Sequence, residues 1–185
     1  INTKTQFSTV ENARQALMGC YGYMSADNAY GQAWQEVTFG YCGFGWSQTN
    51  GSSTDLLVSM DGGIDETINT MAWRGMYKVI GETNAFIANI ADSPLESADK
   101  LPMEAAARFL RALAYYNLAV TYGDVPLKTT PSAHDGVAVP RSPKNEVFEL
   151  VRTDWEFAYE NLPEKDDDGF ATKWAAKAYL GKLYH

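Results

Sequence analysis

The amino-acid sequence predicts a mainly α-helical protein in which consecutive helices form antiparallel hairpins. Apolar residues recur at spacings of three and four in five segments of the chain, which is the pattern of amphipathic helices. Gly, Pro and Asp residues that commonly end helices separate these segments, and little strand signal occurs outside residues 36–60. Small residues with interleaved aromatics recur in 105–126 and 175–185, as in tetratricopeptide-type hairpins.

The first helix is expected over residues 8–24, followed by a long insertion over residues 25–64. Ser8 and Glu11 have the spacing of a capping box, in which each side chain accepts from the other residue's backbone amide. The insertion has no clear period and is rich in Gly, Ser, Asn and aromatic residues. It is far longer than the usual connection of about 4–6 residues, and insertions of this kind are usually functional or disordered.

The remaining helical scaffold is expected over residues 65–185. The second helix covers 65–91, and the third begins with Pro102 as its first helical residue and ends at Gly123. A polar loop over 127–141 follows, and Ser142 with Pro143 is expected to cap the fourth helix, which Pro163 stops. The fifth helical pattern runs from Ala171 to His185 without a stop signal, which is expected of a fragment of a larger domain.

Composition excludes several classes of protein. The chain has 185 residues and a formal net charge of −8, which is compatible with one globular domain or part of one and argues against nucleic-acid binding. No apolar run approaches the roughly 18 residues that a membrane span needs. Cys20 and Cys42 lack the spacing of a zinc site, and they can form one disulfide or remain two free thiols.

The aromatic residues of the insertion are the strongest candidates for a binding site. No Lys or Arg occurs between Arg14 and Arg74, a stretch that contains nine of the fifteen Gly. Sugar rings present apolar C–H faces that stack on flat aromatic rings, and their hydroxyls need polar partners at the rim. The candidate ligand-binding residues are Trp34, Tyr41, Phe44, Trp46, Asn50 and Asp55. The alternative is that these rings form a small core that holds the insertion together.

No catalytic, cofactor or metal site is expected. Asp55, Asp61, Asp65 and Glu66 are the only candidates for a glycosidase carboxylate pair, and the sequence gives no motif for a nucleophile or metal hydrolase. Asp166 and Asp168 sit at positions three and five of a calcium loop, but Ala175 replaces the bidentate Glu, so a solvated turn is expected. Arg108 and Arg111 share a helix face and are expected to form a structural ion pair with Asp124.

Several segments together resemble the SusD/RagB family of bacterial nutrient-binding lipoproteins. The most specific are Ala107 to Leu118, which includes an Arg-Ala helix, and Tyr122-Gly123-Asp124-Val125-Pro126-Leu127 that follows it. The other matching positions are Trp73, Tyr77, Ile80, Asn84, Ile87, Pro140-Arg141-Ser142, Val147-Phe148, Asp154, Ala158, Leu162-Pro163, Thr172-Lys173, Ala175-Ala176 and Tyr179-Leu180. The resemblance covers nearly the whole chain outside the insertion, and it matches the insertion only as a region.

The resemblance implies a role that periodicity alone does not show. Family members are longer proteins with tetratricopeptide-like helix pairs, so residues 1–185 would be the N-terminal part of one SusD-like domain whose C-terminal remainder is absent. They are anchored at the extracellular face of the outer membrane by a lipidated Cys, which lies a short way upstream of a start such as Ile1 and is absent from residues 1–185. They are not enzymes, and they deliver oligosaccharides to a SusC-like TonB-dependent transporter. The lack of basic residues in the insertion favours a neutral glycan. Oligopeptide capture and a tetratricopeptide-like protein-interaction module are the alternatives.

Overall fold

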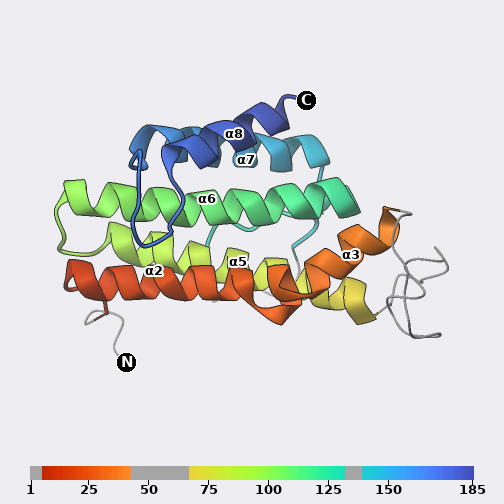
Figure 1. Cartoon of the computed structure of the whole chain (residues 1–185), viewed down its shortest axis with the longest axis horizontal. Helices are drawn as coiled ribbons and strands as arrows, with labels where there is room; N and C mark the ends of the chain where they lie inside the picture. The colour runs from red at the N-terminus through yellow and green to blue at the C-terminus, as the bar shows by residue number, and fades with distance from the viewer. Residues whose placement is uncertain (1–5, 43–66, 132–138) are drawn as a thin grey trace. The chain divides into compact units, whose positions relative to one another are not determined.

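The computed structural model describes residues 6–42, 67–131 and 139–185, and it confirms the predicted mainly α-helical class (Figure 1). Within these residues, no helix combines the length and the apolar character that crossing a membrane requires. The elements in chain order are α2 (Val10–Ser25), the π-turn η1 (Asp27–Gly31), α3 (Ala33–Tyr41), α5 (Thr67–Ala91), α6 (Ser97–Tyr122), β1 (Val125–Pro126), β2 (Arg141–Ser142), α7 (Lys144–Asn161) and α8 (Lys173–Leu183).

The chain divides into two compact units. Unit 1 consists of Ile1–Tyr21 and Val79–His185, and unit 2 consists of Gly22–Lys78. The division falls within α2 and within α5. Unit 1 therefore contains the helix hairpins that the sequence predicts, and the described part of unit 2 contains η1 and α3, which fall inside the predicted insertion.

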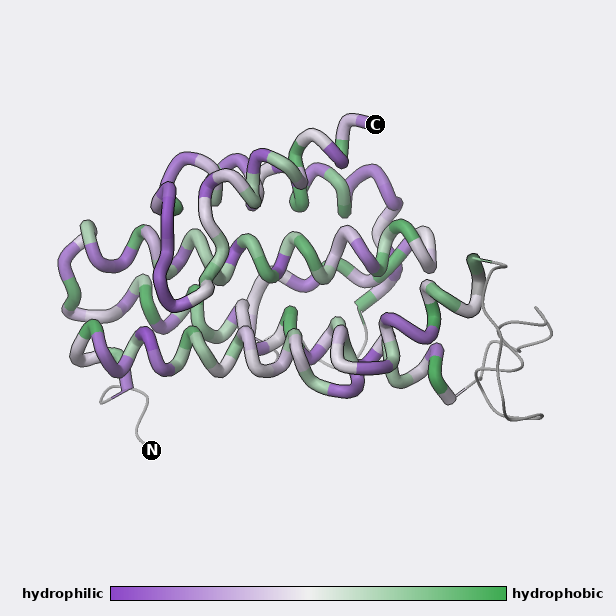
Figure 2. The backbone as a smooth tube through the Cα atoms, in the orientation of Figure 1, coloured by the Kyte–Doolittle hydropathy of each residue, from purple (hydrophilic) through white to green (hydrophobic). Residues whose placement is uncertain are grey.

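In unit 1, α6, α7 and α8 form two successive antiparallel hairpins, as in tetratricopeptide-like folds (Figure 1). Helix α6 is rich in buried Ala, whose small side chains let the neighbouring helices come close. Aromatic rings fill the remaining space: the centroid of the Tyr179 ring lies 5.6 Å from that of Phe109 and 5.1 Å from that of Trp155. Figure 2 shows hydrophobic segments recurring along α6 and a hydrophilic turn between α7 and α8.

Two helices begin at residues other than those that the sequence predicted. Helix α2 begins at Val10, and the Thr9 hydroxyl accepts a hydrogen bond of 3.3 Å from the Asn12 amide, so this cap lies one residue after Ser8. Helix α6 begins at Ser97, which places Pro102 in its second turn instead of at its first position. Proline's fixed φ suits a helix, and its missing N–H removes only one intrahelical bond near the start. The predicted end at Gly123 is confirmed, with φ of 75°.

Asp124 caps α7, and the predicted ion pair between Asp124 and the α6 arginines is wrong. The Asp124 carboxylate accepts a hydrogen bond of 2.9 Å from the Lys144 amide, while Pro143 occupies the N-cap position and offers no side-chain cap. The short antiparallel pairing of β1 with β2 places Val125 opposite Ser142. This pairing brings the end of α6 to the start of α7, so Asp124 is beside the free amides of the α7 N-terminus.

The partner of the arginine pair is a buried carboxylate from α7. Arg111 donates from Nε to Asp154 Oδ2 at 2.7 Å and from Nη2 to Oδ1 at 2.8 Å, and both residues are almost fully buried. Arg111 Nη1 also donates to Asn84 Oδ1 of α5 at 2.9 Å. The amide nitrogen of Asn84 in turn donates to the carbonyl oxygens of Lys128 and Thr130. This chain of contacts ties α5, α6, α7 and the segment after β1 together within unit 1.

Residues 27–41 correct the predicted loop over 25–64, because they form η1 and α3. The three apolar residues Ala33, Trp34 and Val37 are all buried on one face of α3. Their positions, one and four residues apart, follow the helical period. The helix is only nine residues long, and neighbouring Gly and aromatic residues make its pattern hard to recognise in the sequence. Residues 43–64 of the predicted loop lie outside the described residues.

Candidate functional site

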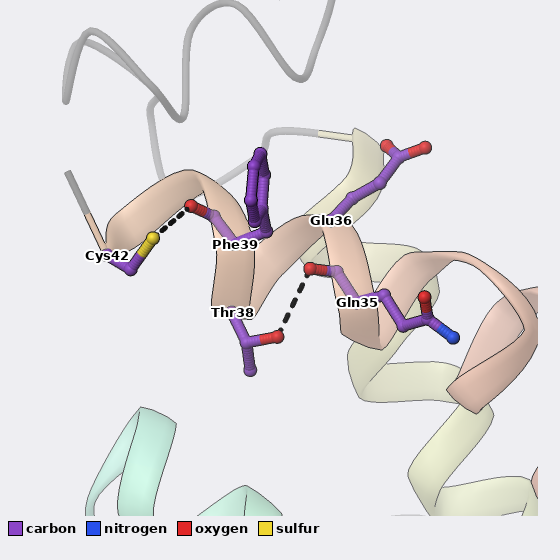
Figure 3. A pocket seen from close by; sticks show the side chains of 5 residues that line it. All are labelled: Gln35, Glu36, Thr38, Phe39 and Cys42. Atoms are coloured by element: carbon purple, nitrogen blue, oxygen red, sulfur yellow. Dashed lines mark hydrogen bonds between the residues drawn. The ribbon is translucent and has the colours of Figure 1, made fainter. Parts of the chain in front are cut away.

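An open pocket of about 580 Å³ lies on α3 in unit 2, at the N-terminal side of the aromatic-rich segment. The described residues that line it are Gln35, Glu36, Thr38, Phe39 and Cys42 (Figure 3). The buried face of α3 is formed by Ala33, Trp34 and Val37, so the opposite face carries the pocket. Phe39 is the most exposed apolar side chain there, with 54% of its surface accessible.

Three of the described residues that line the pocket with Phe39 are polar: Gln35, Glu36 and Thr38. In Figure 3 the ring of Phe39 and the carboxylate of Glu36 project from the same side of α3, whereas Thr38 points to the other side. Gln35 Nε2 donates to the Tyr30 carbonyl at 2.6 Å, and Gln32 Nε2 donates to Glu36 Oε1 at 2.7 Å. These contacts fix the orientation of both side chains. An amide side chain has two donor hydrogens and two acceptor lone pairs, so Gln35 keeps capacity for a further partner.

This arrangement suits a ligand that has both apolar faces and hydroxyl groups. The exposed Phe39 ring offers a flat apolar surface, and the Gln35 amide and the Glu36 carboxylate of the same pocket can pair with hydroxyls. None of the five lining residues is basic, and the sequence holds no Lys or Arg from residue 15 to residue 73. The described part of the pocket lining therefore offers no cation to pair with a carboxylate or sulfate group.

Trp34 occupies a different position from the one expected of a stacking residue. Only 7% of its surface is exposed, and its ring centroid lies 6.4 Å from that of Tyr30, so the indole packs inside unit 2. This matches the alternative considered from the sequence, in which aromatic rings form a small core. Tyr41 is the last residue of α3. Phe44, Trp46, Asn50 and Asp55 lie outside the described residues.

The predicted site residues do not include Phe39, which the structure places in the pocket on α3. It lies two positions after the buried Val37, which places it on the other side of α3. Recognising the short helix would have separated the two kinds of ring, because Ala33, Trp34 and Val37 share one face. A loop gives no such separation, and the sequence could not assign an orientation to any one ring.

The acidic turn before α8 is occupied by an arginine. The Arg14 guanidinium donates to Asp168 Oδ2 at 2.6 Å from Nη2 and at 2.9 Å from Nε, and to Asp166 Oδ2 at 3.2 Å. The Asp166 carboxylate also accepts hydrogen bonds from the Asp168 and Phe170 amides. Among the described residues, no group of three or more His, Cys, Asp or Glu side chains is placed to hold a metal ion. The turn is thus a structural clasp between α2 and the start of α8 within unit 1.

Both cysteines are free thiols. Cys20 is buried in unit 1, and Cys42 is exposed at the end of α3, where its Sγ donates to the Phe39 carbonyl at 2.9 Å. Burial raises the pKa of the Cys20 thiol to about 12, and the nearby Glu82 carboxylate adds to this rise. The carboxylates considered for a glycosidase pair, Asp55, Asp61, Asp65 and Glu66, lie outside the described residues.

Comparison with known protein families shows which family this chain belongs to. The model of the SusD-like family described as "Starch-binding associating with outer membrane" matches residues 5–185. The chain belongs to this SusD-like family. The resemblance that the sequence motifs indicated is thereby confirmed, and the match extends across the aromatic-rich insertion as well as the helical scaffold.

Individual SusD-like proteins are similar to this chain in sequence and structure. A SusD-like protein of Bacteroides ovatus is 33% identical over 125 residues, which are 65% of this chain and 23% of that protein. A laminarin-binding SusD-like protein has 25% identity and a TM-score of 0.80, over 96% of this chain and 40% of its own. A structure with xylogluco-oligosaccharide has 26% identity and a TM-score of 0.76, over 91% of this chain and 34% of its own. The chain thus spans about a quarter to two fifths of the length of these SusD-like relatives.

Proposed function

We propose that this protein binds oligosaccharides at the bacterial outer membrane and acts as the glycan-binding partner of a SusC-like TonB-dependent transporter. The observation that carries the proposal is the match of the SusD-like family model over residues 5–185, a family described as starch-binding and associated with the outer membrane. The similarity to a laminarin-binding SusD-like protein and to a structure with xylogluco-oligosaccharide supports a glycan ligand. Delivery to the transporter and a lipid anchor at the extracellular face are the parts of the proposal that rest on family membership alone.

The proposed binding site is the exposed face of α3 together with the aromatic-rich segment that follows it. Phe39 supplies an exposed ring, and Gln35 and Glu36 supply polar groups beside it. Tyr41, Phe44, Trp46, Asn50 and Asp55 are proposed to complete the site, because they follow α3 directly in the sequence. Trp34 is proposed to support the site indirectly, by anchoring α3 within unit 2, since only 7% of its surface is exposed.

The proposed ligand is a neutral glycan. A carboxylated or sulfated sugar needs Arg or Lys side chains for charge-assisted hydrogen bonds, and the described residues of the pocket lining include neither. The Glu36 carboxylate and the net charge of −8 would also repel an anionic chain. The protein is proposed to act by binding alone, so an oligosaccharide incubated with it should be recovered unchanged.

Calorimetry on the intact protein tests the proposal. The ligands are laminarin and xyloglucan oligosaccharides, a uronic-acid oligosaccharide and a set of oligopeptides. The expected result is saturable binding of a neutral glycan, with weaker or no binding of the acidic one. Saturable binding of peptides with no binding of any glycan would contradict the ligand class and favour the oligopeptide alternative. Binding of neither class, with capture of a protein partner only, would favour an interaction module.

Aromatic variants test the location of the site. Phe39→Ala and Trp46→Ala are each expected to weaken glycan binding by about tenfold, because a lost stacking contact is worth about 0.5–1.5 kcal/mol beyond its buried area. Trp174→Ala is the matched control, since Trp174 is an aromatic residue with 50% exposure on α8 of unit 1. Its removal should leave glycan affinity unchanged. Glycan binding that survives the combined Phe39→Ala and Trp46→Ala change would contradict the site assignment.

A further inference from the structure

Helix α5 has a glycine at the point where the backbone of η1 crosses it in unit 2. A Cβ atom built on Gly75 would collide with the main-chain carbonyl of Asn28, and it would lie 3.0 Å from the Ala29 nitrogen. These neighbours are backbone atoms, which cannot move aside by rotating a side chain. The close approach of η1 to α5 therefore depends on the absence of a side chain at position 75.

The η1 turn is also packed closely against the residues that directly precede it, Ser25 and Ala26. The amides of Ala29 and Gly31 both donate to the Ala26 carbonyl, at 2.8 and 3.0 Å. A Cβ atom on Gly31 would lie 2.6 Å from the Ser25 carbonyl oxygen and 2.9 Å from that of Ala26. Ala29 is fully buried and has φ of −123° and ψ of −122°, outside the helical region. A movement of η1 away from α5 would therefore break hydrogen bonds within the turn itself.

The position of α3 follows from that of η1. Gln35, which lines the pocket, donates from its side-chain amide to the Tyr30 carbonyl of η1 at 2.6 Å. The ring of the buried Trp34 lies beside the ring of Tyr30. These two contacts join the first turn of α3 to η1, and one of them comes directly from a pocket residue. A shift of η1 would be passed to the polar rim of the pocket and to Phe39.

We infer that Gly75 is a positioning residue for the proposed carbohydrate site. It provides the seat for η1 on α5, and η1 in turn sets the direction of α3 and of the Phe39 ring. Gly75 itself does not line the pocket, so its effect on binding is indirect. That the ligand is a carbohydrate rests on the proposed function, whereas the close packing of η1 against Gly75 does not.

Gly75→Ala in the intact protein, compared with the wild type, tests the inference by amide hydrogen exchange and by calorimetry with a xyloglucan or laminarin oligosaccharide. Alanine favours a helix more than glycine, so α5 itself is not weakened by the change. The expected results are exchange about tenfold faster in residues 26–42 and glycan affinity about tenfold weaker, because overpacking typically costs enough to change an equilibrium by that factor. Residues of α6 should exchange at the wild-type rate, which a general loss of stability would not allow.

Gly22→Ala is the matched control, because Gly22 also lies in a helix of unit 2 and has open space where its Cβ would be. It should change neither the exchange of residues 26–42 nor glycan affinity. If Gly75→Ala unfolds the whole protein, Gly31→Ala replaces it, since the added Cβ would collide with the Ser25 and Ala26 backbone and so distort η1 itself. Local acceleration over α3 then supports the inference, and its absence overturns it.

The outcomes separate this inference from the proposed function. Wild-type exchange rates in residues 26–42 of the Gly75→Ala protein overturn the inference, whatever the glycan measurement gives. A wild-type protein that binds none of the glycans contradicts the proposed function, and the exchange rates alone then decide the role of Gly75. Faster exchange over α3 with unchanged glycan affinity overturns the link between Gly75 and the binding site.

Discussion

The guanidinium of Arg111 and the carboxylate of Asp154 form a two-pronged ion pair, with N–O distances of 2.7 and 2.8 Å, inside unit 1. Asp154 is fully buried and Arg111 is 5% exposed. Water cannot screen or solvate either charge at such a site, so each depends on the other. The pair joins α6 to α7 in the first hairpin, and the contact of Arg111 with Asn84 extends it to α5.

Removing only the carboxylate should destabilise the protein strongly. Asp154→Ala leaves Arg111 buried without its counter-charge, and such changes cost about 3–5 kcal/mol of unfolding free energy. Urea denaturation followed by circular dichroism measures the loss. Glu149→Ala is the control on the same helix, because its ion pair with Arg152 is exposed and should matter far less.

A double substitution distinguishes the effect of an orphaned charge from the value of the pair itself. Replacing both residues by apolar ones, as in Arg111→Met with Asp154→Leu, should recover most of the lost stability, because a well-packed apolar pair often matches a buried ion pair. A double variant as unstable as Asp154→Ala would indicate that the hydrogen bond from Arg111 to Asn84 is the essential contact.

The clasp between Arg14 and the acidic turn should make stability depend on pH. Burial alone would raise the pKa of Asp166, but hydrogen bonds from the Phe170 amide, Arg14 and the Asp168 amide outweigh it and lower the pKa below its ordinary value. A lowered folded-state pKa contributes stability above the unfolded-state pKa of about 4, and this stability is lost as pH falls through the folded-state value.

Asp166→Asn should therefore be less stable than the wild type at pH 7, and the difference should shrink as the pH falls below about 4. Urea midpoints of the two proteins at pH 7, 5 and 3 measure this convergence. Asp167→Asn is a neighbouring control, because Asp167 is exposed and pairs only with the exposed Lys165 among the contacts of this turn. A difference between wild type and Asp166→Asn that stays constant down to pH 3 would contradict the role of the clasp.

Two glycines in unit 1 should respond in opposite directions to the same substitution. Gly123 ends α6 with φ of 75°, a conformation that costs other residues about 1–3 kcal/mol, so Gly123→Ala should lower stability by that amount. Gly181 lies within α8 with open space at its Cβ position, and Gly181→Ala should raise stability by about 0.5–1 kcal/mol. Thermal unfolding of both variants checks the pair, and a stabilising Gly123→Ala would exclude the assigned helix end.

Local signals in the sequence predicted the features that depend on neighbouring residues. Gly123 and Pro126 marked the end of α6 correctly, because the positive φ of a glycine and the missing N–H of a proline affect the backbone at their own positions. The mainly α-helical class followed from periodicity over long segments such as α5 and α6. The start of α6 was less well predicted, since Pro102 fits either the first position or the second turn of a helix.

Contacts between distant segments could not be predicted in the same way. Arg111 could pair with any carboxylate that the hairpin brought near, and Asp154 is 43 residues away whereas Asp124 is close in sequence. The same holds for the candidate site. Trp34 and Phe39 are equally aromatic, and only the packing of α3 buries the first and exposes the second. Burial of a ring depends on what lies across from it, which a short and irregular segment does not encode locally.

The two free thiols should differ sharply in reactivity. A thiol reacts as its thiolate, so accessibility and a low pKa both favour reaction. Burial raises the pKa of Cys20 to about 12, which leaves almost no thiolate at pH 8, whereas Cys42 is exposed at the end of α3.

A chromogenic disulfide reagent at pH 8 should therefore label one thiol per molecule rapidly in the native protein and the second only in denaturant. Cys42→Ser should abolish the rapid labelling of the native protein and leave one thiol that reacts only in denaturant, and Cys20→Ser should keep the rapid labelling and lose the thiol that needs denaturant. Rapid labelling of Cys20 in the native Cys42→Ser protein would show that α2 opens in solution far more readily than its packing in unit 1 allows.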